Sequence, residues 1–170
     1  LALQAIKLIN RSLRTAVYNG EHRKARADMA YGSLLAGISL ANAGVGAVHA
    51  LAYPLGGTFK VPHGISNSVL LPYVMEYNAD SPAREKYLGI AKAMGVDTEG
   101  MSVDEGVAAA IKAVRDLSIS VNIPQKLHEI GVKKEDLHDL AVAAFNDVCT
   151  GGNPRPTSVE DIEELYNIAF

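Results

Sequence analysis

The chain has 170 residues, of which 48% are hydrophobic and 21% are charged. This length suits one domain, and this composition excludes a disordered chain. The net charge of −3 excludes a strongly basic protein, so nucleic acid is not an expected partner. Cys149 is the only cysteine, which excludes an internal disulfide framework and predicts a reducing, cytoplasmic compartment.

Apolar side chains recur every three or four residues along most of the chain, and this spacing predicts helices. The first helix is expected to run from the start of the chain to about residue 18, where Asn19 and Gly20 supply a left-handed end. A long second helix is expected from about His22 to about Asn42.

No formally charged side chain lies between Asp28 and Lys60, which is a stretch long enough to suggest a membrane span. Ser33, Asn42 and several glycines interrupt this stretch, and a bilayer would leave their polar groups without partners. A helix buried among other helices of the same protein explains the stretch better, so no membrane association is predicted.

Glycine and proline are concentrated in residues 44–63. We expect a short helical turn that holds His49, then a loop, and then a new helix that begins near His63 and ends near Asn78. Pro62 suits the start of that helix, because the first helical turn has no use for a backbone N–H.

Further helix starts are marked in the second half of the chain. Ser102 with Glu105, and Thr157 with Glu160, have the spacing of capping boxes. No segment shows a convincing strand pattern, and no linker divides the chain. The sequence therefore predicts an all-α, multi-helix bundle that forms a single domain over residues 1–170.

The five histidines fall into two groups. His22, His128 and His138 have charged neighbours and are expected on the surface. His49 and His63 lie in the glycine- and proline-rich segment, where a reversal of the chain can bring two imidazoles to one metal ion. Buried histidines satisfied by hydrogen bonds are the alternative, and the spacing alone leaves both interpretations open.

Several segments closely resemble the iron-containing alcohol dehydrogenase family. They are Ala-Arg-Ala-Asp-Met-Ala-Tyr at residues 25–31, Gly-Ala-Val-His-Ala-Leu-Ala-Tyr-Pro-Leu-Gly-Gly at 46–57, Val-Pro-His-Gly at 61–64, Leu-Pro-Tyr-Val-Met-Glu-Tyr-Asn at 71–78 and Asn-Pro-Arg-Pro-Thr at 153–157. The resemblance covers nearly the whole chain. It implies a fragment that corresponds to the C-terminal helical domain, of the dehydroquinate synthase-like type, without the N-terminal nucleotide-binding domain.

The resemblance also implies a reaction. In the intact enzyme, a divalent metal, iron(II) or zinc, would polarise a small primary alcohol, and hydride would pass between its carbon and NAD or NADP to give the aldehyde. His49 and His63 would be metal ligands, and a homo-oligomer is left open. The family's other two ligands, an aspartate and a histidine, precede Leu1, so we expect the chain alone to be poor in metal and inactive.

Tyr53 departs from the family pattern, because many members have a histidine there that is thought to relay a proton. Tyrosine titrates near ~10 and is a poorer proton carrier at neutral pH. Tyr53 is the candidate catalytic residue, as a hydrogen-bond donor to substrate or ribose, and packing against the loop is its alternative role. Two further functions stay open: a binding or structural helical domain without catalysis, and a glycerol dehydrogenase-like relative.

Overall fold

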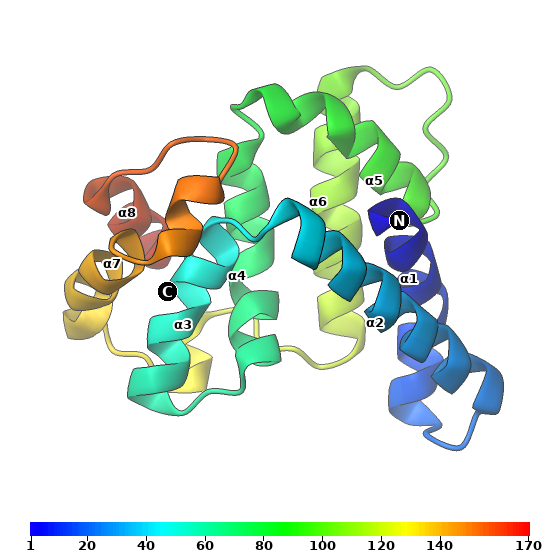
Figure 1. Cartoon of the computed structure of the whole chain (residues 1–170), viewed down its shortest axis with the longest axis horizontal. Coiled ribbons are helices and arrows are strands. Elements are labelled where there is room, and N and C mark those ends of the chain that lie inside the picture. Colours follow the sequence, from blue (N-terminus) through cyan, green and yellow to red (C-terminus); the bar gives the residue numbers. More distant parts are fainter. The chain divides into compact units, whose positions relative to one another are not determined.

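The computed structural model describes all residues from 1 to 170, and every regular element in it is helical (Figure 1). This confirms the predicted all-α class. The α-helices are α1 (Ala2–Tyr18), α2 (Arg23–Ala43), α3 (Ala47–Phe59), α4 (His63–Asn78), α5 (Tyr87–Ala93), α6 (Val103–Ser120), α7 (Leu137–Phe145) and α8 (Val159–Ala169). The 3₁₀ helices are η1 (Pro82–Lys86), η2 (Leu127–Ile130), η3 (Lys134–Asp136) and η4 (Val148–Gly152).

The chain divides into two compact units, one of residues 1–44 with 84–121 and one of residues 45–83 with 122–170. The single domain predicted over residues 1–170 stays a prediction. Each unit is formed by two separate stretches of the chain, so contacts between residues far apart in sequence stabilise both.

In the first unit, α1 and α2 lie side by side as an antiparallel pair (Figure 1). Gly32 allows their close approach, because a Cβ at this position would lie 2.8 Å from Cγ1 of Ile9. Asp28 on α2 accepts hydrogen bonds from Ser12 Oγ at 2.6 Å and from Arg11 Nε at 3.2 Å, both on α1. Small residues and one ion pair therefore hold this helical hairpin together.

The sequence predicts the start of α2 correctly but not the conformation that ends α1. The second helix begins as expected, with the ring of His22 accepting a hydrogen bond from the backbone N–H of Ala25. The left-handed end expected for the first helix is wrong, because Asn19 has φ −139°. A backbone hydrogen bond from the N–H of His22 to the carbonyl of Asn19 closes the turn in its place.

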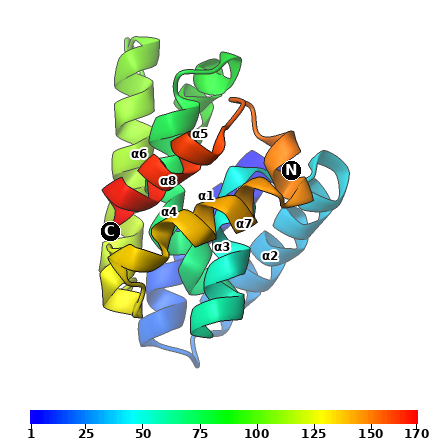
Figure 2. The ribbon, with the colours of Figure 1, turned by 90° about the vertical axis from the view of Figure 1, so that its left-hand side faces the viewer.

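The second unit contains the main hydrophobic core, formed by apolar side chains of α3, α4, η2, α7 and α8. Figure 2 shows α7 lying against α3. The hydroxyl of Tyr166, on α8, is buried in this core and donates to the carbonyl of Leu51, on α3, at 2.7 Å. This core fixes α3 and α4, the two helices that carry the predicted site residues.

The segment around His49 folds differently from the prediction. It forms a full helix of 13 residues, with Pro54 inside it, rather than a short turn followed by a loop. A proline inside a helix costs about 3 kcal/mol, since one hydrogen bond is lost. Burial of Ala50, Leu51 and Leu55, each at 0% exposure, offsets that cost and keeps the segment helical.

Of the two capping boxes predicted in the second half of the chain, one forms as predicted and the other is shifted by one residue. The capping box of Ser102 and Glu105 forms as expected at α6. At α8 the capping box is formed by Ser158 and Asp161, one residue later than predicted. The hydroxyl of Thr157 is buried without a partner instead.

No single helix is both long enough and apolar enough to cross a membrane. Taken together, residues 23–43 and 47–59 would pass the same test of length and composition.

Candidate metal centre

The turn between α3 and α4 brings two histidine rings together. Lys60, in the left-handed region at φ 56°, ends α3, and after a short connection His63 begins α4. The centroid of the His63 ring lies 5.2 Å from that of His49. His49 lies in the first turn of α3. The sequence instead predicted that His49 would lie at the end of a short helical element.

This separation suits two ligands of one metal ion. Two imidazoles that bind a tetrahedral metal with metal–nitrogen distances of ~2.1 Å have ring centroids about 5 Å apart. The structure therefore brings the predicted ligands to a distance at which they fit a shared ion. Their metal ligation stays a prediction.

The surroundings of His49 favour a neutral imidazole. Burial lowers the pKa of His49, and the neighbouring His63 lowers it further. Its Nδ1 atom is buried and has no hydrogen-bond partner in the protein. A buried nitrogen without a partner is costly, and a neutral ring is the form that binds metal, so both features fit a group bound at this ring.

His63 is held in place by the next turn of its own helix. The side-chain nitrogen of Asn67 donates to the backbone carbonyl of His63 at 2.9 Å and lies 3.0 Å from its Nε2. His63 is also exposed, so it is open to a ligand from outside the chain.

The chain provides only part of a coordination sphere. No group of three or more His, Cys, Asp or Glu side chains is arranged to hold a metal ion. Iron(II) favours a mixed set of nitrogen and oxygen ligands, and no carboxylate joins the two rings. The residues present fit a metal as two ligands among several.

Tyr53 lies beside the histidine pair, one helical turn after His49. Its ring stacks on that of His63, with 5.2 Å between centroids and 11° between planes. Its hydroxyl lies close to the thiol of Cys149 on η4. Burial, and then the nearby Cys149 and Asp147 side chains, raise the pKa of Tyr53, so its phenol stays protonated as a donor.

Two residues near this site were not predicted to take part in it. Cys149 contacts Tyr53, and hydrogen bonding to Asp147 and burial raise its pKa, so the thiol is kept neutral. The side-chain oxygen of Asn153 accepts from the backbone N–H of Ala47 at 3.2 Å and so caps the start of α3. The Asn-Pro-Arg-Pro segment at residues 153–156 is the sequence signal that marks Asn153.

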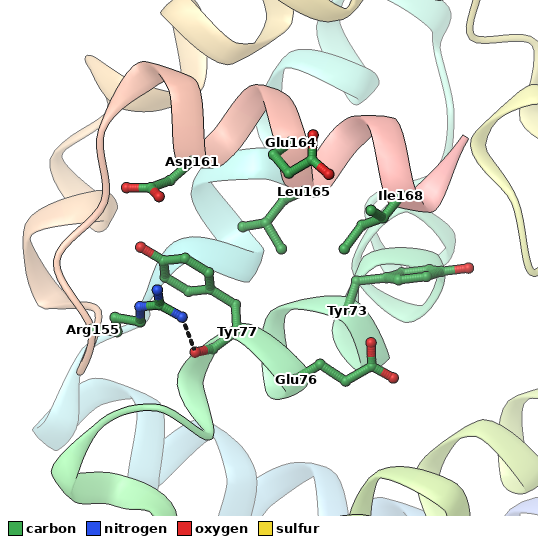
Figure 3. Close-up of a pocket in the computed structure, with 8 residues that line it drawn as sticks. All are labelled: Tyr73, Glu76, Tyr77, Arg155, Asp161, Glu164, Leu165 and Ile168. Carbon is green, nitrogen blue, oxygen red and sulfur yellow. Dashed lines mark hydrogen bonds between the residues drawn. The ribbon is translucent and has the colours of Figure 1, made fainter.

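Asn153 and Arg155 connect the segment before α8 to α3 and α4. Asn153 exchanges side-chain hydrogen bonds with Asn78 at 3.0 and 2.7 Å. The guanidinium of Arg155 lies 3.9 Å from the ring centroid of Tyr77 and donates to the Tyr77 carbonyl at 3.0 Å (Figure 3). These contacts fix the orientation of α3 and therefore of His49.

Figure 3 shows that this Arg155–Tyr77 contact forms one wall of a separate pocket between α4 and α8. The pocket has no histidine among its lining residues. The three histidines predicted on the surface, His22, His128 and His138, are exposed as expected.

The all-helical fold is similar to the C-terminal domain of iron-containing alcohol dehydrogenases. The family described as "Fe-containing alcohol dehydrogenase family, C-terminal" matches residues 1–170, so the chain belongs to this family.

Two curated relatives and one solved structure illustrate the similarity. A lactaldehyde reductase of Escherichia coli (strain K12) is 48% identical over 170 residues, with 100% of this chain and 44% of the relative covered. An NAD-dependent methanol dehydrogenase of Bacillus methanolicus is 42% identical over 169 residues, with 99% and 44% covered. A crystal structure of 1,3-propanediol oxidoreductase has a TM-score of 0.96 and 43% identity, with 99% and 44% covered. The chain thus spans less than half the length of these relatives.

Proposed function

We propose that this chain is the metal-binding domain of an NAD(P)-linked alcohol dehydrogenase that interconverts a small primary alcohol and its aldehyde. The observation that carries the proposal is the 5.2 Å separation of the His49 and His63 rings in a chain of the iron-containing family. Three of the similar proteins have names that refer to small alcohols or aldehydes, namely lactaldehyde, methanol and 1,3-propanediol.

His49 and His63 would hold the metal, with iron as the ion that the family name indicates. A bound divalent metal supplies Lewis-acid polarisation of the substrate oxygen. The lowered pKa of His49 keeps its ring neutral and available as a ligand at neutral pH. The phenol of Tyr53, kept protonated, would donate a hydrogen bond to the substrate or to the ribose of the cofactor.

The rest of the enzyme would lie outside residues 1–170, because relatives are more than twice as long as this chain. That part would bind the nicotinamide cofactor and complete the metal's ligand set. The name of the Bacillus methanolicus relative supports NAD as the cofactor. By itself this chain would bind metal weakly, since two neutral imidazoles without a carboxylate are a poor site for iron(II).

The test uses the complete product of the gene, loaded with iron(II) without oxygen and assayed with NAD, NADP and short primary alcohols. We expect His49→Ala and His63→Ala each to lose stoichiometric metal and alcohol-dependent reduction of the cofactor. His138→Gln, a variant of an exposed histidine, is the matched control and should keep both. Full metal content in both alanine variants would overturn the proposal, and metal binding without turnover would favour a binding domain.

A further inference from the structure

Helix α2 has apolar or small side chains on two sides, and the first unit covers only one of them. Toward α1 lie Ala25 and Gly32, its two buried residues. On another side, Ala27, Tyr31, Leu34, Ile38 and Ala41 follow one another at steps of four, three, four and three residues. We call this second set the α2 seam.

The α2 seam is exposed along its whole length. Tyr31 is 63% exposed, Leu34 57% and Ile38 39%, and both alanines are exposed as well. A helix that is apolar on two sides is typical of one packed between other helices. Because steps of four and three residues keep side chains on one face, the seam has the spacing of helix-on-helix packing.

The charges near the seam restrict what can cover it. Arg23 and Lys24 lie about one turn before Ala27, at the N-terminal end of α2. The only acidic residue of α2, Asp28, is already paired with Arg11 and Lys24. A covering helix therefore needs an apolar face along the seam and an acidic group at the end that meets Arg23.

We propose that the α2 seam is the docking face for an amphipathic helix, acidic at one end, from the part of the same polypeptide outside residues 1–170. This inference rests on the proposed function, in which the chain belongs to a longer enzyme. The relatives' greater length supports that source, because over half of each lies outside the matched region.

The test measures cysteine accessibility in the complete gene product. Leu34→Cys and Ile38→Cys place thiols on the seam, whereas Ser33→Cys places one on α2 at an exposed position away from it. Maleimide labelling is followed by mass spectrometry of each peptide, which separates the new thiols from Cys149. We expect both seam thiols to react at least tenfold more slowly than the Ser33→Cys thiol, at protein concentrations from 0.5 to 50 µM.

The possible results separate the sources of protection. Equal labelling of seam and control thiols would overturn the inference, as would a gene product that is no longer than this chain. Protection that disappears on dilution would also overturn it, in favour of a second copy of the chain. Two seam variants guard against a folding defect in one of them, and the circular dichroism of each is compared with the parent.

The labelling result is independent of catalysis. A protected seam in a protein without metal-dependent activity would leave this inference standing and defeat the proposed function. An accessible seam in an active enzyme would defeat this inference and leave the proposed function standing. An added charge provides a second readout: Arg23→Glu should speed labelling of the Leu34→Cys thiol, because the acidic end of the docked helix would be repelled.

Discussion

The phenol ring of Tyr53 lies nearly parallel to the imidazole of His63, at 11° and with 5.2 Å between the ring centroids. Tyr53 is on α3 and His63 begins α4, so the stacked rings connect the two helices that form the candidate metal centre. Tyr53 is still 45% exposed, which leaves part of the phenol open to a molecule bound beside the histidines.

Removing only the hydroxyl of Tyr53 separates its two candidate roles. In Tyr53→Phe the stacked ring remains, and the hydrogen bond that the phenol would donate is lost. A hydrogen bond contributes about 1–2 kcal/mol, so we expect kcat/KM for the alcohol to fall roughly 5- to 30-fold in the complete enzyme. Bound metal, measured by elemental analysis, should be unchanged.

An unchanged kcat/KM in Tyr53→Phe would contradict this role and show that Tyr53 acts by packing alone. Tyr53→Leu then gives the comparison, because it removes the stacked ring as well. If packing is the whole role, only the leucine variant should weaken metal binding through a displaced His63.

Glycine at position 152 is required by the contact between η4 and the start of α3. A Cβ on Gly152 would lie 2.7 Å from the backbone carbonyl oxygen of Val45, so Gly152→Ala must displace one of the two segments. We expect a loss of about 1–3 kcal/mol in the free energy of unfolding, measured with denaturant. In the complete enzyme, the same displacement should reduce activity, because Cys149 on η4 contacts Tyr53.

The neighbouring glycine is a matched control for this effect. A Cβ on Gly151 would have no atom within 4 Å, and its φ is outside the left-handed region. We expect Gly151→Ala to be neutral or to stabilise by up to about 1 kcal/mol, through the smaller entropy of the unfolded chain. Equal effects of the two substitutions would contradict the steric argument.

The buried hydroxyl of Tyr166 makes a contact that stabilises the core below α3. It donates to the carbonyl of Leu51 at 2.7 Å, and burial raises the pKa of Tyr166 far above its ordinary value. We expect Tyr166→Phe to lower the free energy of unfolding by about 1–2 kcal/mol, since a buried bond is lost without a large cavity. Chemical denaturation measures this, and Tyr31→Phe, at a position 63% exposed, should change stability much less.

Periodicity and capping signals predicted most of the helices because these are local properties of the sequence. The capping box at Ser102 depends on side chains three residues apart, and it forms as predicted. At α8 both Thr157 and Ser158 were available as caps, and the neighbouring residues alone did not decide between them. Pro54 favoured a loop locally, but burial of Leu51 and Leu55 outweighed that preference.

The candidate site was less accessible to prediction where it depends on distant contacts. His49 and His63 are close in sequence, so a single turn brings their rings together. The cap that Asn153 provides for Ala47 joins residues 106 positions apart, and periodicity carries no information about such a pair. The contact of Cys149 with Tyr53 has the same origin, because it depends on how η4 packs against α3.

The ion pair of His138 and Glu163 gives the second unit a pH-dependent contact between α7 and α8. Nδ1 of His138 lies 2.8 Å from a carboxylate oxygen of Glu163. That hydrogen bond, and then the charge of Glu163, raise the pKa of His138 above its ordinary value of 6.5. The folded state therefore binds a proton more tightly than the unfolded state does.

This difference fixes the sign of the pH dependence. The contribution to stability is fully present below pH 6.5, the ordinary value, and is lost as pH rises through the raised pKa. We expect Glu163→Gln to lower Tm by about 1–3 °C at pH 5.5 and to leave it unchanged at pH 8.5, because exposed pairs contribute little. Thermal melts at the two pH values test this, with Glu21→Gln, an exposed carboxylate in the turn between α1 and α2, as the control. An effect of Glu163→Gln that is larger at pH 8.5 than at pH 5.5 would contradict the assigned direction.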